Sequence, residues 1–227
     1  METKAIPEQI SLKWFDIWCL AFIRPTIKTF SQIIADPKAG IKWGIIWMVI
    51  STLIIWFAGL QRPLLTAFVT DNFGPQVVFY FLLVGAIVFA LFGVIILLIM
   101  AAMSHGLARL FAGAGTFHQL VYCWAVISPP FILLSGLVIN LPSLFLSSRS
   151  FMFSTTGWTL QFISLLVFTG VNLYQFYAEV VAFSAVEKLG ILKGFGILIL
   201  QAIIISIVVA CLSFSFQTLT MNLAQLH

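Results

Sequence analysis

Five long stretches without Asp, Glu, Lys or Arg constrain this chain more than any other feature of its sequence. They cover residues 43–61, 72–104, 110–148, 150–178 and 194–226. An α-helix needs about 20 mostly apolar residues to cross the hydrocarbon core of a bilayer, and only helices or closed barrels satisfy their backbone polar groups there. Because the stretches do not alternate strictly between apolar and polar residues, helices are favoured over a barrel.

The composition excludes a soluble globular domain. Only 8% of the 227 residues are charged, and 62% are hydrophobic, whereas a soluble domain carries roughly 25% charged residues because its surface faces water. We therefore predict an all-α polytopic membrane bundle over residues 41–227, preceded by an interfacial segment over residues 1–40. The five expected transmembrane helices cover about 41–60, 77–103, 118–139, 158–186 and 195–216.

The positions of Lys and Arg predict how the bundle is oriented. With five spans, nine of the eleven Lys and Arg residues fall in the N-terminal segment and in the two loops on the same side of the membrane. Short cytoplasmic loops of membrane proteins carry an excess of these residues. The N-terminus is therefore expected in the cytoplasm and the C-terminus outside.

A short helix over residues 12–24 is expected to lie in the membrane interface. Its polar side chains Lys13, Asp16 and Arg24 fall on one narrow stripe, and Trp14 and Trp18 lie one turn apart on the apolar side. Such a helix places its aromatic side toward the membrane and its cationic side outward. A short re-entrant or core helix is the alternative. A second apolar helical face follows and ends before Asp36-Pro37, which completes an expected N-terminal amphipathic helix pair.

The basic N-terminal segment predicts membrane lipid as a partner. Six of the eleven Lys and Arg residues precede the first span, in a segment too rich in Trp, Phe and Ile for a solvated nucleic-acid-binding arm. Anionic headgroups attract such segments. We expect headgroup binding and no nucleic acid; other membrane proteins or a second copy of the chain are further candidate partners.

Ionisable and polar side chains inside the spans are candidates for function, because they are costly there. Four of them fall on roughly one face of the fourth span: Gln161, Asn172, Gln175 and Glu179. His105 and Arg109 lie one turn apart at the cytoplasmic end of the second span. We hypothesise that Arg109 pairs with Glu179. The polar face then either lines a cavity for a substrate or proton, or supplies hydrogen bonds between helices, and the second interpretation is favoured.

Two further patterns concern helix packing. Pro129 and Pro130 are expected to interrupt the third span, since proline removes backbone donors and leaves carbonyl groups in need of partners. Ala86, Ala90 and Gly93 share one face of the second span, which predicts the close approach of a neighbouring helix.

No group of residues predicts catalysis, a metal site or a cofactor site. The chain has no HExxH, GxSxG or phosphate-loop motif, and Gly113-x-Gly115 is too short for dinucleotide binding. Cys19, Cys123 and Cys211 lie far apart without metal-ligand spacing. We predict that the protein is not an enzyme.

Two neighbouring segments resemble the core signature of the Yip family, the membrane proteins named for binding Ypt/Rab GTPases. They are His105-Gly-Leu-Ala-Arg109-Leu-Phe and Gly113-Ala-Gly115-Thr-Phe117, followed by a span that contains Pro129. The resemblance implies five spans and a cytoplasmic N-terminus. The N-terminal sequence pattern is similar to that of short bacterial members of the family. This similarity implies that the protein resides in a prokaryotic plasma membrane. Eukaryotic members act in vesicle traffic and carry a long cytoplasmic N-terminal region, whereas about 40 residues precede the first expected span here.

These observations favour a non-enzymatic scaffold that organises the membrane or recruits partner proteins. The alternative is a small transporter or lipid-translocating protein that uses the polar face of the fourth span, since discontinuous helices often line substrate sites.

Overall fold

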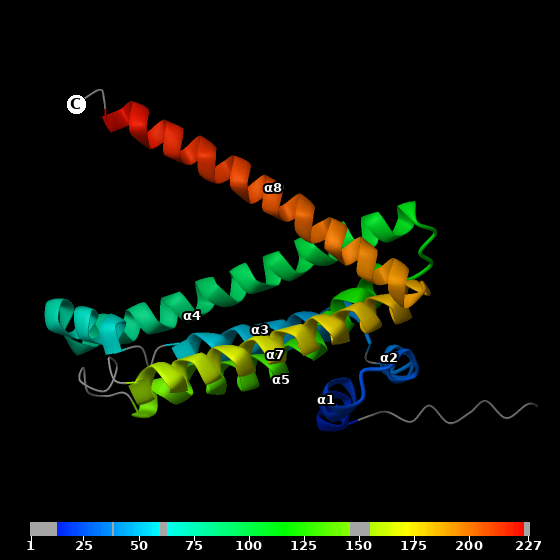
Figure 1. The fold of residues 1–227 in the computed structure, drawn as a ribbon, viewed down its shortest axis with the longest axis horizontal. Coiled ribbons are helices and arrows are strands. Elements are labelled where there is room, and N and C mark those ends of the chain that lie inside the picture. Colours follow the sequence, from blue (N-terminus) through cyan, green and yellow to red (C-terminus); the bar gives the residue numbers. More distant parts are fainter. Residues whose placement is uncertain (1–12, 38, 60–62, 146–154, 225–227) are drawn as a thin grey trace, which may run out of the picture.

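The computed structural model describes residues 13–37, 39–59, 63–145 and 155–224, and over these ranges the regular structure is helical. The helices run along the chain in the order shown in Figure 1. They are α1 (Trp14–Ile23), α2 (Ile27–Ile34), α3 (Ile41–Gly59), α4 (Pro63–Leu110), α5 (Phe117–Phe145), α7 (Thr155–Glu187) and α8 (Ile191–Ala224).

Four of these helices are long and apolar enough to cross a membrane. The apolar segments are Leu82–Leu110 of α4, Phe117–Val138 of α5, Trp158–Glu187 of α7 and Ile191–Cys211 of α8. A shorter apolar helix, Ile41–Trp56, lies within α3. The predicted all-α membrane fold is confirmed, whereas the fifth span, over α3, stays a prediction.

Helix α5 forms the centre of the bundle. It packs most extensively against α3 and α7, and it also contacts α1, α2 and α4. Half of its apolar segment is buried within the chain, against 17% for α4 and 22% for α8. The large side chains of Tyr122 and Phe131 are buried in this core. The apolar faces of α4 and α8 must therefore be covered from outside the chain, by lipid or by protein.

Small residues let α3 approach α4 closely, as predicted. Ala86 and Ala90 are buried, and a Cβ atom at Gly93 would collide with the side chain of Thr52 on α3. The indole nitrogen of Trp56 donates to the backbone oxygen of Leu82 at 3.1 Å, which adds a hydrogen bond between the two helices.

Helix α1 is packed against the bundle. It is apolar on almost all sides, with Asp16 as its one charge, and its buried residues Ile17 and Ala21 belong to the core. The ring of Trp18 lies 5.0 Å from that of Trp47 on α3. Trp18 is partly buried against this core, and its interfacial position stays a prediction. The side chain of Trp14 lies outside the described residues.

Helix α2, in contrast, is clearly amphipathic. Phe30 and Ile33 are fully buried, and the helix lies along α7. Its first turn is capped by Thr26, whose hydroxyl accepts a hydrogen bond from the backbone N–H of Thr29 at 3.1 Å. The two N-terminal helices thus form a layer on α5 and α7 at one end of the bundle (Figure 1).

Two expected interruptions differ from the structure. Helix α5 continues through Pro129 and Pro130, so the predicted break is wrong. The fixed φ angle of proline, about −65°, is close to the helical value, so the backbone follows the helix although each proline lacks an N–H donor. Residues 63–73, expected within a loop, are helical, and the chain kinks at Gly74, whose φ is 75°.

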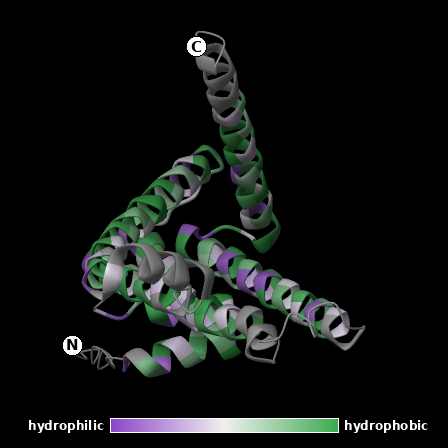
Figure 2. Cartoon of the chain, turned by 90° about the vertical axis from the view of Figure 1, so that its left-hand side faces the viewer, coloured by the Kyte–Doolittle hydropathy of each residue, from purple (hydrophilic) through white to green (hydrophobic). Residues whose placement is uncertain are grey.

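Helix α8 stands apart from the rest of the bundle. Its main contacts are with α7 and α4, and beyond them it diverges from α4 toward the C-terminus (Figures 1 and 2). Figure 2 shows that its residues are hydrophobic along most of the length drawn in colour, and Ile203, Ile207 and Phe214 are among its exposed side chains. Such a surface suits the hydrocarbon core of a bilayer.

Candidate functional site

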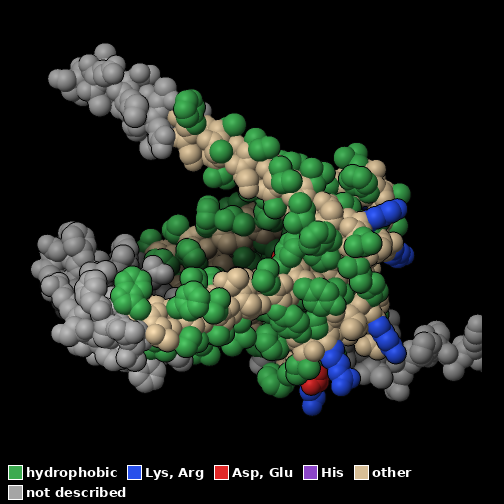
Figure 3. Space-filling view, in the orientation of Figure 1, with side chains coloured by type: hydrophobic (Ala, Val, Ile, Leu, Met, Phe, Trp, Pro, Cys, Tyr) green, Lys and Arg blue, Asp and Glu red, His purple; other side chains and the backbone are tan. Residues whose placement is uncertain are grey.

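Basic side chains gather at one end of the molecule, which we call the basic end (Figure 3). They come from the two ends of α1, from α2, from the start of α3, from the end of α4, and from the turn after α7 with the first turn of α8. The exposed ones are Lys13, Arg24, Lys28, Lys42, Arg109, Lys188 and Lys193. Of the acidic side chains that the structure describes, only Asp16 is exposed. The described Lys and Arg residues of the N-terminal segment and of the two loops counted with it therefore lie together at one end of the structure.

Beneath the basic end, the buried carboxylate of Glu187 holds three segments together. Its Oε1 lies 2.6 Å from Nδ1 of His105 on α4. Its Oε2 accepts the backbone N–H of Gly115 at 3.1 Å, and its backbone oxygen accepts the N–H of Ala114 at 2.9 Å. Because Glu187 ends α7 and is fully buried, it fixes α7 to α4 and to the turn before α5.

Arg109 completes this arrangement from the exposed side. Its Nη2 donates to the backbone oxygen of Gly115 at 2.8 Å, and its Nη1 to that of Gly113 at 3.3 Å. Its Nε donates to Nε2 of His105 at 3.4 Å. Arginine has donors only, so this imidazole nitrogen accepts, and Nδ1 of a neutral His105 donates to Glu187. We call His105, Arg109, Glu187 and the turn 113–115 the polar junction.

The glycines of the turn are required by the closeness of α7. A Cβ atom at Gly113 would lie 2.9 Å from Oε2 of Glu187, and one at Gly115 would lie 2.9 Å from its Cα. Both distances are shorter than real Cβ contacts, so a larger residue would push the turn away from Glu187.

The two helices that meet at the junction end in the same way. Ala112 and Lys188 have positive φ angles of 65° and 56°, in the left-handed region that glycine usually occupies at a helix C-terminus. The N–H of Gly113 donates to the oxygen of Ala108 at 2.8 Å, and that of Leu189 to the oxygen of Ser184 at 3.0 Å. These bonds turn each chain sharply out of its helix.

The hypothesised pair of Arg109 and Glu179 does not form. Arg109 uses its donors on the turn, and Glu179 accepts from Nε2 of Gln175 at 2.9 Å. The physical reason is depth: Glu179 lies eight residues before Glu187 on α7, roughly 12 Å along the helix axis. Glu187 is the acidic residue at the level of the α4 end.

The other polar residues of the fourth span do not form one continuous face. Asn172 is exposed, and its Nδ2 donates to the backbone oxygen of Phe168 at 2.7 Å on its own helix. Gln161 is partly buried. Glu179, which accepts a hydrogen bond from Gln175, borders a cavity.

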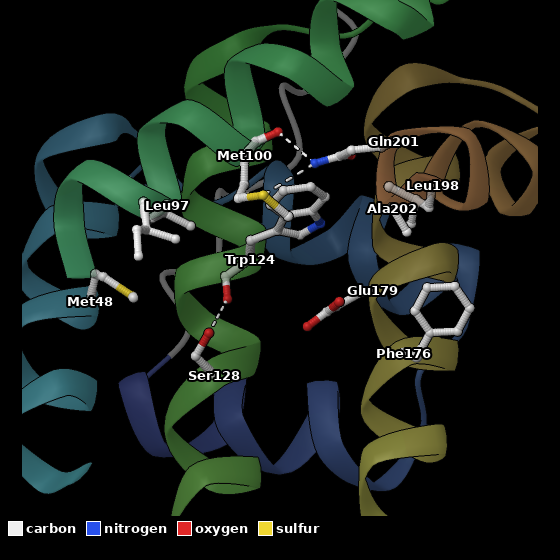
Figure 4. Close-up of a pocket in the computed structure, with 11 residues that line it drawn as sticks. Met48, Leu97, Met100, Trp124, Ser128, Phe176, Glu179, Leu198, Gln201 and Ala202 are labelled. Atoms are coloured by element: carbon white, nitrogen blue, oxygen red, sulfur yellow. Dashed lines mark hydrogen bonds between the residues drawn. The ribbon is translucent and has the colours of Figure 1, made fainter. Parts of the chain in front are cut away.

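This cavity has a volume of about 340 Å³ and lies where five helices meet (Figure 4). Its polar lining comes from Trp124 and Ser128 on α5, Glu179 on α7 and Gln201 on α8; Met48 and Met100 are among the apolar lining residues. Pro129, one residue from Ser128, is buried and Pro130 is partly buried. Among the described residues no three His, Cys, Asp or Glu side chains gather as metal ligands do.

The sequence analysis missed three residues of these sites: Glu187, Trp124 and Gln201. Gln201 is 2% exposed; it hydrogen-bonds the hydroxyl of Ser104, and its Nε2 donates to the oxygen of Met100 at 3.2 Å. An amide inside the uncharged stretch 194–226 was the available signal for Gln201. For Glu187 the available signal was indirect: the pair Gly113 and Gly115 indicates that another part of the chain, here the end of α7, comes close to the backbone of this turn.

Comparison with known proteins agrees with the resemblance of the sequence. The Yip1 domain family matches residues 20–213, a range that includes the polar junction, the cavity and the last four residues of α1. No curated protein and no solved structure matches the chain. With its apolar helices and a match over most of its length, the chain is an integral membrane protein that belongs to the Yip1 domain family.

Proposed function

We propose that this protein is a non-enzymatic membrane scaffold whose basic end faces the cytoplasm and recruits anionic lipids and partner proteins. The observation that carries the proposal is the basic end, where exposed Lys and Arg residues from five segments lie together with Asp16 as the one exposed acidic side chain described. A membrane-proximal Lys or Arg contributes about 1 kcal/mol to the attraction to an anionic surface.

Packing supports the same proposal. The turn before α5 is joined to the ends of α4 and α7 through the polar junction, and α1 and α2 pack on α5 and α7, so these contacts support the segments that carry the charges. The proposed topology has five spans, with α3 as the first, the N-terminus in the cytoplasm and the C-terminus outside a prokaryotic plasma membrane. The excess of basic residues on the cytoplasmic side of membrane proteins supports this orientation.

The test is co-purification in mild detergent. The charge-reversed variant replaces Arg24, Lys28, Lys188 and Lys193 by Glu; the control variant exchanges Lys and Arg at the same positions. Mass spectrometry measures anionic phospholipid per protein and the proteins that accompany it. We expect the charge-reversed variant to lose at least tenfold of both, and the control to retain them. Equal recovery from the two monodisperse variants would overturn the proposal.

A small transporter or lipid-translocating protein is the second candidate function, and the cavity that contains Glu179 favours it. This candidate predicts a flux across reconstituted vesicles that Glu179→Gln abolishes while the protein still elutes as a monodisperse peak. The scaffold proposal predicts no flux for either protein.

A further inference from the structure

The cavity at Glu179 contains hydrogen-bonding groups that the protein does not satisfy. Trp124 is nine-tenths buried, and its indole N–H has no hydrogen-bond partner among the residues that the structure describes. In Figure 4 the indole nitrogen is turned toward the space between Gln201 and Glu179. A buried donor without a partner costs roughly 1–3 kcal/mol, so an acceptor from a ligand would stabilise this arrangement.

Glu179 supplies the complementary group on the opposite wall. Its carboxylate points into the cavity (Figure 4), and the one hydrogen bond it accepts among the described residues comes from Gln175 on its own helix. A carboxylate at this depth needs a cation or strong donors, because the surrounding hydrocarbon offers none. The other polar side chains are already engaged: Gln201 binds Ser104 and Met100, and Ser128 binds Trp124 O.

The surroundings of the cavity are suited to hydrocarbon chains. The cavity lies where α8 begins to diverge from α4 (Figure 1). Figure 3 shows a notch between these two helices, which we call the two arms, and hydrophobic side chains border it. The apolar side chains of Ile96 and Ile203, on the two arms near the cavity, are 42% and 51% exposed. An occupant with a polar end in the cavity could therefore place apolar chains between α4 and α8.

We propose that this cavity binds a phospholipid with a primary ammonium headgroup, with its ammonium on Glu179 and a phosphate or ester oxygen on the indole N–H of Trp124. A fully apolar lipid would leave the indole N–H of Trp124 without an acceptor and Glu179 with the hydrogen bond from Gln175 alone. A quaternary ammonium has no N–H to donate to the carboxylate, and an anionic headgroup without an amine would be repelled by it. The proposal goes beyond the scaffold role and is tested separately from it.

The test is native mass spectrometry of the purified, delipidated full-length protein. Phosphatidylethanolamine, phosphatidylcholine and phosphatidylglycerol with identical acyl chains are added in turn. We expect one phosphatidylethanolamine to bind at least fivefold more strongly than either of the other lipids. Equal occupancy by all three lipids on the wild-type protein would overturn the proposal, whatever the variants do.

Two variants assign the selectivity to the cavity. Glu179→Gln and Trp124→Phe should each reduce phosphatidylethanolamine binding to the level of phosphatidylcholine. The matched controls are Trp43→Phe, which removes an indole from the exposed start of α3, and Asn172→Ala, which changes an exposed residue of α7; both should bind as the wild type does. Equal losses in the controls would contradict the assignment.

A soluble headgroup tests whether the acyl chains contribute to binding, and it therefore distinguishes a lipid from a free amine as the ligand of the cavity. Phosphoethanolamine carries the same ammonium and phosphate without acyl chains, and we expect that it does not displace the lipid at equal concentration. Displacement at equal concentration would show that the notch between α4 and α8 contributes nothing, and the lipid would no longer be the assigned ligand.

Discussion

Oε1 of Glu187, at the C-terminal end of α7, lies 2.6 Å from Nδ1 of His105 on α4, although the two residues are 82 positions apart in the sequence. Glu187 is fully buried, and its second oxygen accepts the N–H of Gly115. The contact therefore connects two membrane helices and the turn that leads into the central helix. The basic end owes its fixed arrangement to this connection.

Replacing Glu187 by Ala should destabilise the protein strongly. The change leaves the Nδ1–H of His105 and the buried N–H of Gly115 without their acceptor, and each buried donor left without a partner costs about 1–3 kcal/mol. Thermal unfolding in detergent measures the effect, with the exposed Lys193→Ala as control. Glu187→Gln, which keeps an acceptor oxygen, should fall between the two. If Glu187→Ala melted together with Lys193→Ala, the junction would not stabilise the bundle.

Two converse exchanges between Ala and Gly in the turn after α4 should change the free energy of unfolding in opposite directions. Ala112→Gly should raise the unfolding free energy by about 1 kcal/mol, because a left-handed residue with a Cβ costs roughly 1–2 kcal/mol. Gly115→Ala should lower it, since the new Cβ would meet Glu187 Cα at 2.9 Å. The same melting experiment measures both. Two changes of the same sign would contradict the described turn.

The contact between α3 and α4 predicts that the size of residue 93 limits stability. Gly93→Leu places a large side chain where even a Cβ would strike Thr52, and overpacking of this kind costs about 1–3 kcal/mol. Gly170→Leu is the matched control, because no atom lies within 4 Å of a Cβ at that position. Because Leu favours a helix more than Gly does, Gly170→Leu should not lower the melting temperature; an equal fall in both variants would show that the contact with Thr52 does not set the effect.

The proposed orientation is tested by cysteine accessibility. In a variant in which Cys19, Cys123 and Cys211 are replaced by Ser, single cysteines are introduced at Lys28 and Lys193 of the basic end, and at the exposed Leu137 toward the other end of α5. A membrane-impermeant maleimide should label the first two only in inside-out vesicles, and Leu137→Cys only in intact cells if it lies at the membrane surface. Labelling of Lys28→Cys in intact cells would invert the topology.

The sequence predicted the membrane fold well because charge exclusion over some 20 residues is a strong signal. The observed start of α3 coincides with the predicted one, at residue 41, and α7 ends within a residue of the predicted 186. The break at Pro129 was wrong because the fixed φ of proline is compatible with a helix, and the packing of α5 at the centre of the bundle decides whether the helix continues. Local residue type alone does not carry this information.

The site residues were harder to predict, for a physical reason that Glu179 and Glu187 illustrate. Both are Glu residues of one helix, and the sequence favoured Glu179 because it lies deeper in an apolar stretch. Which of them meets Arg109 depends on how far α4 extends and how sharply the chain turns at Ala112. Trp124 was not singled out, because an indole in a membrane span is ordinary until the structure places its N–H beside an empty space.

The central claim, that the basic end recruits partners in the cytoplasm, is tested most directly by site-specific photocrosslinking in living cells. A photoreactive amino acid replaces Lys28 or Lys193 at the basic end, or Leu137 as a control on the exposed surface of α5. The scaffold account predicts crosslinks to the same soluble cytoplasmic proteins from Lys28 and Lys193, and none of these from Leu137. Crosslinks to lipid alone from both basic-end positions, or the same proteins from Leu137, would contradict it.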